Sequence, residues 1–169
     1  DLETVPDVQA WAAATGLHGH AEKSLREQMG DKFPRQIFHR IVCLGALLAD
    51  RGADGVWRTT ALEAPTLDQR GERDLIQDFV DRIDQLKPRL VTFNGKTFDV
   101  PFLLDRCSIH GIPMQEPAYH FDVLHAARKQ WGRAMPNCKL QTLERLICKR
   151  SRHGDIPGEQ IPEAYHDYV

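Results

Sequence analysis

The sequence predicts an α/β fold, a mixed sheet of antiparallel hairpin strands and parallel strands flanked by helices. Three observations predict it. An apolar run at 41–49 is followed by a turn cluster at 51–55 and a second strand-like run, which together indicate a hairpin. An amphipathic helical pattern then occupies 72–86. After it, a short apolar run precedes further helical patterns, as expected for strands joined by helices.

The first half of the chain supplies the hairpin. Residues 1–5 predict the end of a first strand, and 8–30 predict an irregular, partly helical insertion on the surface. The run Ile41–Ala49 (IVCLGALLA) is nearly continuous apolar, as is typical of a central strand buried on both faces. Val56–Leu62 is expected to pair with it.

The second half alternates strands and helices. The helix at 72–86 is expected to end at Lys87-Pro88, because a residue before proline disfavours helical geometry. Leu90–Phe93 predicts the next strand. A helix is expected over 98–109, with Gly111 as its stop.

The last third is predicted to be mainly helical. Tyr119–Phe121 indicates a short strand, and Asp122 is expected to cap a helix over 123–131. Leu140, Leu143, Leu146 and Ile147 predict another helix, and Pro162-Glu163 opens a final one.

Composition places the chain among single-domain globular proteins. Its 169 residues are 41% hydrophobic and 27% charged, so we expect one domain over 1–169. A formal charge of −2 argues against a generally basic nucleic-acid coat but allows a local basic groove. The four cysteines form no CxxC pair, which favours reduced, buried thiols over zinc. With no membrane-length apolar run and no signal peptide, a cytoplasmic location away from membranes is expected.

Both ends of the chain suggest a longer protein. There is no initiator Met, a functional-looking motif begins at residue 1, and the sequence stops inside a helical pattern. We expect this chain to be truncated at both ends.

The most informative stretch is Asn94-Gly95-Lys96-Thr97-Phe98-Asp99. It places a carboxylate just past a strand and at the start of a helix. Asp1 and Glu3 occupy alternate positions of the first strand and therefore point the same way. Three converging carboxylates suit a pair of hard divalent cations, which hydrolyse phosphodiesters by activating water and stabilising the leaving oxygen. Taken singly, each motif also suits a strand edge or a turn and helix cap.

These motifs resemble the first two of the DEDD 3′–5′ exonucleases of the ribonuclease-H-like superfamily. The residues of these motifs are most similar to those of bacterial predicted 3′–5′ exonucleases related to the proofreading domain of family-B DNA polymerases. The resemblance spans nearly the whole chain, with 8–37 the least matched part, and implies a ribonuclease-H-like fold. Besides 1–7 and 94–99, it is carried by residues 38–42, 88–93, 121–128 and 155–165.

The resemblance implies hydrolysis at nucleic-acid 3′ ends, DNA favoured over RNA, with two Mg²⁺ or Mn²⁺ ions. By position, Asp1, Glu3 and Asp99 match the catalytic metal-binding acids. The motif positions near the terminal nucleotide are Thr4, Asn94 and Phe98; for Phe98, a core role is the alternative. A different reading is a non-catalytic nucleic-acid-binding or interaction module on the same fold. A third reading keeps the metals but makes the protein a structure-specific endonuclease. No protein partner is indicated.

Other residues carry weaker signals. The basic run Lys149–Arg152 suits phosphate contact and a solvated helix end equally. Asp155 lies in a Pro/Gly loop, where a turn role is expected. Core or partial-core positions are expected for Trp11, Trp57 and Trp131.

The third motif of the family, Tyr-x-x-x-Asp or His-x-x-x-x-Asp, does not occur: Tyr119 and Tyr165 lead to Val123 and Val169. We predict that the fourth acid follows Val169, so that residues 1–169 alone are inactive and the longer protein cleaves. A nuclease assay of both with Mg²⁺ or Mn²⁺ checks this. Activity of residues 1–169 would mean that another acid completes the site.

Overall fold

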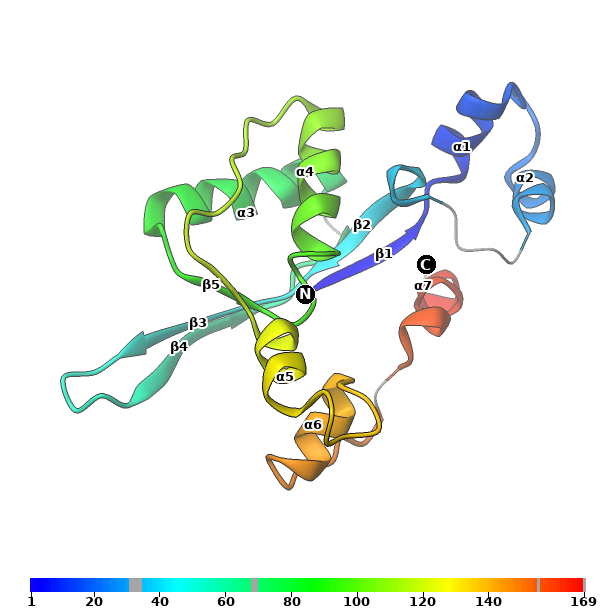
Figure 1. Ribbon diagram of the computed structural model, residues 1–169. Coiled ribbons are helices and arrows are strands. Elements are labelled where there is room, and N and C mark those ends of the chain that lie inside the picture. The colour runs from blue at the N-terminus through cyan, green and yellow to red at the C-terminus, as the bar shows by residue number, and fades with distance from the viewer. Residues whose placement is uncertain (31–34, 68–69, 155, 169) are drawn as a thin grey trace. The chain divides into compact units, whose positions relative to one another are not determined.

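The computed structural model describes residues 1–30, 35–67, 70–154 and 156–168, which form a mixed α/β structure (Figure 1). Within these ranges the strands pair as two antiparallel ladders and one parallel ladder, and seven α-helices accompany them. The chain divides into two compact units. One consists of Asp1–Ile76 with Gly158–Val169, and the other is Gln77–Pro157.

The first unit is built on an antiparallel pair, β1 (Leu2–Pro6) and β2 (His39–Leu44). Leu2 faces Leu44 and Pro6 faces His39, with a β-bulge between Glu3 and Thr4. The bulge breaks the alternation of the strand, so that both Thr4 and Val5 are buried. The predicted first strand and the buried apolar character of β2 are confirmed.

The predicted single strand over 41–49 was wrong, because one strand ends at Leu44, before Gly45, and the next begins at Ala46. The Gly45 N–H donates to the Asp1 carbonyl, and the Asp1 amino group donates to the Gly45 carbonyl, both at 2.9 Å. Past this point β3 (Ala46–Arg51) forms the predicted hairpin with β4 (Trp57–Glu63). Leu47 and Leu62 face each other across the hairpin yet are 57% and 73% exposed. An apolar run does not distinguish a buried strand from such a pair.

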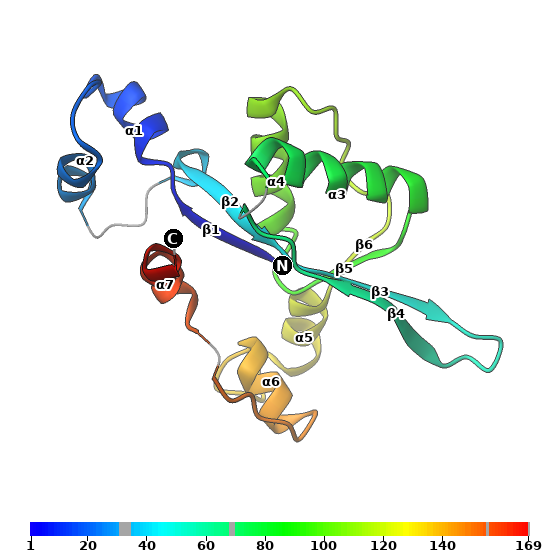
Figure 2. The ribbon, with the colours of Figure 1, turned by 180° about the vertical axis from the view of Figure 1, so that it is seen from behind.

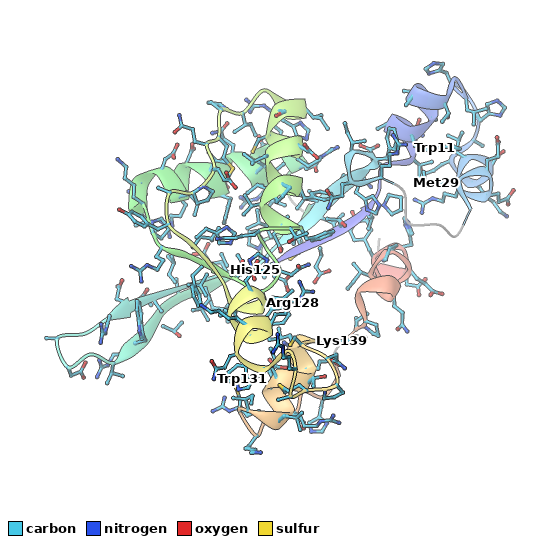
Figure 3. The ribbon with its side chains drawn as sticks, in the orientation of Figure 1. Trp11, Met29, His125, Arg128, Trp131 and Lys139 are labelled. Carbon is cyan, nitrogen blue, oxygen red and sulfur yellow. The ribbon has the colours of Figure 1, made fainter. Side chains whose placement is uncertain are left out.

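Two regular helices replace the irregular insertion expected over 8–30. They are α1 (Val8–Thr15), capped by Asp7, and α2 (Glu22–Met29). They share a small core of Val8, Ala12 and Leu25, against which Trp11 and Met29 pack from either helix (Figure 3). A 3₁₀ turn, η1 (Gln36–Phe38), leads into β2. Residues 31–34 and Asp155 lie outside the described residues.

Helix α3 (Glu72–Leu86) has the predicted bounds and runs from the first unit into the second. Its first residue fixes it to β2, since the Ile41 N–H donates to Glu72 Oε1 at 2.7 Å. Leu75, Ile76 and Val80 are its buried residues at helical spacing. The final predicted helix is α7 (Ile161–Tyr168), which follows η3 (Gly158–Gln160) and contacts β1.

The second unit contains the parallel pair β5 (Leu90–Thr92) and β6 (His120–Asp122), visible from behind in Figure 2. The crossover between them holds α4 (Asp99–His110), which ends at Gly111 in the left-handed conformation, as predicted. Phe102, which is fully buried, Leu103 and Cys107 form the buried face of α4. After β6 come α5 (Val123–Trp131) and α6 (Leu140–Leu146), also as predicted.

The burial of the cysteines and of Trp57 differs from expectation, whereas Trp11 and Trp131 are half-buried. All four cysteines are free thiols, but only Cys107 of the four is buried and Cys148 is exposed. Trp57 is 64% exposed, and six of the seven residues of β4 are exposed. Among the described residues, we find no helix with the length and apolar character needed to cross a membrane.

Phe102 is expected to be a main source of stability in the second unit. Replacing this fully buried ring by alanine should lower the free energy of unfolding by about 3–5 kcal/mol through lost burial and a cavity. Urea unfolding measures it. The matched variant Ile109→Ala, on the same helix but 50% exposed, should cost far less. Equal losses for both would contradict this account of the core.

Candidate functional site

The loop Asn94–Phe98 is a tight turn between β5 and α4. Asn94 adopts φ 71°, in the left-handed region that asparagine tolerates well. Its carbonyl accepts hydrogen bonds from the N–H groups of Thr97 and Phe98 at 3.1 and 3.0 Å. At Gly95 a Cβ atom would lie 2.4 Å from Thr92 Oγ1, so a residue without a side chain is needed. Asn-Gly therefore fits the turn that the sequence indicated.

Asp122 holds this loop in place. Its Oδ1 accepts hydrogen bonds from the N–H groups of Asn94 at 2.9 Å and Leu124 at 3.0 Å. Its Oδ2 accepts one from the Lys96 N–H at 3.0 Å. The predicted cap of α5 is confirmed, but the two bonds to the loop were missed. The parallel order of the strands was the available signal, because it brings the ends of β5 and β6 together.

The Asp122 carboxylate is buried, with 3% of its surface exposed. Burial raises the pKa of this carboxyl, but the hydrogen bonds from Lys96, Asn94 and Leu124 outweigh burial, and the pKa lies below its usual value. The side chain is thus an anion that accepts three backbone donors at once.

Asp99 is the first residue of α4 and is half-buried. Asp99 also contributes to the local field around His120. Burial and the positive charge of Lys96 lower the pKa of His120, while Asp122, Glu116 and Asp99 act in the opposite direction. The His120 ring is fixed by a contact of 2.8 Å between Nε2 and Thr92 Oγ1.

Phe98 lies between the loop and the core. Its ring packs against Phe102 with centroids 5.8 Å apart and an interplanar angle of 39°. It is half-buried rather than enclosed. This packing agrees with the core interpretation of Phe98, and contact with a nucleotide base stays a prediction.

The other predicted acids lie on or beside β1 in the first unit. Asp1 is exposed and Glu3 is half-buried, whereas Leu2 between them is buried, as the two-residue period predicts. Glu3 lies opposite Cys43, where burial and the Glu3 charge raise the pKa of the thiol. Thr4 is buried, with its hydroxyl 3.4 Å from His39 Nδ1. Its contact with a nucleotide therefore stays a prediction.

The predicted acids come from both units, Asp1 and Glu3 from the first and Asp99 from the second. In the part of the chain that the structure describes, no group of three or more His, Cys, Asp and Glu side chains is gathered as a metal site. The donor set itself consists of accessible or half-buried carboxylates, which are ligands for Mg²⁺ or Mn²⁺ rather than for softer metals. Convergence of the three acids stays a prediction.

A hollow of about 470 Å³ adjoins the loop within the second unit. Sequence reasoning did not foresee it, because its lining comes from three separate segments. The lining combines apolar, amide and cationic side chains, among them Phe93, Asn94, Leu124, Arg128, Asn137 and Lys139. Figure 3 labels Arg128 on α5 and Lys139 at the start of α6.

Comparison with known proteins assigns the family. Residues 39–169 match the RNase H superfamily, and the chain belongs to it. Asp99 falls within the matched residues, while Asp1 and Glu3 precede them. The chain is also similar to YprB of Bacillus subtilis (strain 168), a protein described as uncharacterized, with 34% identity over 97 residues. That match covers 56% of this chain and 23% of YprB, so the chain spans about a quarter of that relative.

Replacing Asp122 by asparagine should loosen the loop. An amide cannot accept at both terminal atoms, so at least one backbone N–H is left without its acceptor, at a cost of about 1–3 kcal/mol. Because the folded-state pKa of Asp122 is lowered, its stabilisation is complete above the unfolded-state pKa of about 3.9 and is lost as pH falls through the folded pKa.

Chemical unfolding across the acid range measures both effects. The wild type should lose stability as the medium is acidified, and Asp122→Asn should lose less. Asp84→Asn, at an exposed position of α3, serves as the control and should follow the wild type. If Asp122→Asn keeps the wild-type stability and its dependence on pH, the hydrogen bonds of Asp122 to the loop do not stabilise the fold.

Proposed function

We propose that this protein is a metal-dependent 3′–5′ exonuclease of the DEDD type that hydrolyses phosphodiester bonds at nucleic-acid 3′ ends, with DNA favoured. Membership of the RNase H superfamily, which includes many nucleases, supports nuclease chemistry in general. The observation that carries the proposal is the clamped loop. Asp122 holds the backbone of Asn94 and Lys96 in this loop, which follows a strand of the parallel pair and leads to Asp99 at the first turn of α4.

In this proposal Asp1, Glu3 and Asp99 bind two Mg²⁺ or Mn²⁺ ions through carboxylate oxygens. The chemistry supplied by such a pair is activation of water and stabilisation of the leaving oxygen. Asn94, Phe98 and Thr4 are assigned to the terminal nucleotide. Asp122 acts through the loop as a positioning residue, because it holds the backbone that carries Asn94 and leads to Asp99.

The proposal includes the organisation and location expected from the sequence. We infer that residues 1–169 form one RNase-H-like exonuclease domain with a mixed sheet, and that the protein works in the cytoplasm. The alternative is a nucleic-acid-binding or interaction module without catalysis. Degradation of an oligonucleotide labelled at its 5′ end distinguishes them. Progressive shortening from the 3′ end supports the exonuclease, internal cuts indicate an endonuclease, and binding without cleavage indicates the module.

Asp99→Asn should abolish cleavage by the whole protein and weaken binding of divalent cations. Folding should be kept, because in this proposal the acids converge, and removing one of them relieves their mutual repulsion when no metal is bound. Calorimetric Mn²⁺ titration and the nuclease assay measure the two effects. The control is Asp105→Asn, an exposed acid of the same helix, which should retain activity. Wild-type cleavage by Asp99→Asn would remove Asp99 from the site.

A further inference from the structure

Positive charge is concentrated in one segment of the second unit. Residues 123–154, from the start of α5 to just past α6, contain eight Lys and Arg residues and one acid, a formal charge of +7. The whole chain has a formal charge of −2, so the remaining residues carry −9. Such segregation within a weakly acidic protein marks a surface for a polyanion. We call residues 123–154 the basic segment.

The cations of the basic segment are available at the surface. All eight are exposed: Arg128, Lys129, Arg133, Lys139, Arg145, Lys149, Arg150 and Arg152. The single acid, Glu144, is engaged by Arg152, whose Nε lies 2.8 Å from Glu144 Oε2. Among the described residues, the other seven cations have no carboxylate partner within ion-pair distance. No described carboxylate therefore neutralises their charge.

The basic segment adjoins the candidate site through the hollow beside the loop. Arg128 and Lys139, both labelled in Figure 3, come from different elements of the segment. Both line the hollow together with Asn94. Asn137 also lines it, and its Oδ1 accepts the Lys139 N–H at 3.0 Å, which fixes the backbone just before α6. Apolar Phe93 and Leu124 complete a mixed lining that suits a nucleotide, with cations for phosphate and an apolar surface for the base or sugar.

We propose that the basic segment binds the phosphate backbone of a single-stranded nucleic acid, and that Arg128 and Lys139 hold a nucleotide in the hollow beside Asn94. The inference rests on the proposed nuclease function for the identity of its ligand. The run Lys149–Arg152, for which the sequence left phosphate contact and a solvated helix end open, becomes part of this surface. Neither Arg128 nor Lys139 is assigned a role in the chemical step.

Backbone binding by cations has a recognisable salt dependence, because each neutralised phosphate releases counterions. For single strands, the slope of log K against log salt changes by about 0.7 for each contact. Loss of two contacts should reduce the slope by about 1.4 and weaken binding about tenfold at moderate salt, with little dependence on sequence.

The experiment measures fluorescence anisotropy of a labelled thymidine oligonucleotide with the whole protein in EDTA, where binding is read without hydrolysis. The test variant is Arg128→Ala with Lys139→Ala. The control is Lys23→Ala with Arg73→Ala, two exposed cations of α2 and α3 that change the net charge equally. Circular dichroism verifies that both variants fold, and single variants replace the double if it does not. Vesicles of phosphatidylcholine with phosphatidylserine provide the competing polyanionic surface.

The inference predicts weaker binding and a smaller slope for the test variant only. Equal affinities for test and control variants, no oligonucleotide binding by the wild type, or preference for anionic vesicles would each overturn it. Cleavage is assayed separately with Mg²⁺. Binding that depends on Arg128 and Lys139 without cleavage supports the surface and refutes the nuclease. Cleavage with unchanged binding by the test variant supports the nuclease and refutes the surface.

Discussion

The second unit depends on one buried carboxylate. Parallel pairing sets Thr92 beside Asp122, so a side chain of this length reaches the backbone that continues from β5 while it also caps α5. Three N–H donors converge on two oxygen atoms and compensate for the loss of water around the charge. The same contact therefore fixes the end of one strand, the turn that follows the other and the start of a helix.

The turn can be so tight because several local choices agree with this contact. Asn94 accepts the left-handed conformation, and Gly95 leaves room for the Thr92 side chain. The carbonyl of Asn94 then receives the first donors of the following turn. The backbone geometry of this turn places Asp99 at the first position of α4. The packing of Phe98 on Phe102 attaches the same loop to the core. Residues 94–99, three of which are proposed to contribute to the site, are therefore held by backbone and core contacts.

Patterns that depend on local periodicity, or on a turn between neighbouring strands, were predictable, whereas contacts between segments distant in the sequence were not. Helix α3 was found within its observed bounds because six apolar residues repeat at helical spacing. The apolar run through Leu47 predicts one buried strand, because periodicity does not reveal that Gly45 ends one ladder and that β3 begins another. Asp122 was recognised as a cap, but its bonds to Asn94 and Lys96 span 28 and 26 residues. The hollow likewise has no signature in sequence, because its lining is assembled only by folding.

The uneven charge of the chain has a consequence for handling the protein. An isoelectric point near 6.5 suggests a molecule that a cation-exchange resin would not retain at neutral pH. A resin interacts with local patches of surface charge rather than with the net charge of the molecule, and the basic segment supplies a concentrated patch of positive charge. The chain should therefore elute from such a column later than its net charge suggests, and the proposed nucleic-acid binding predicts that cellular nucleic acid accompanies it unless high salt is used during purification.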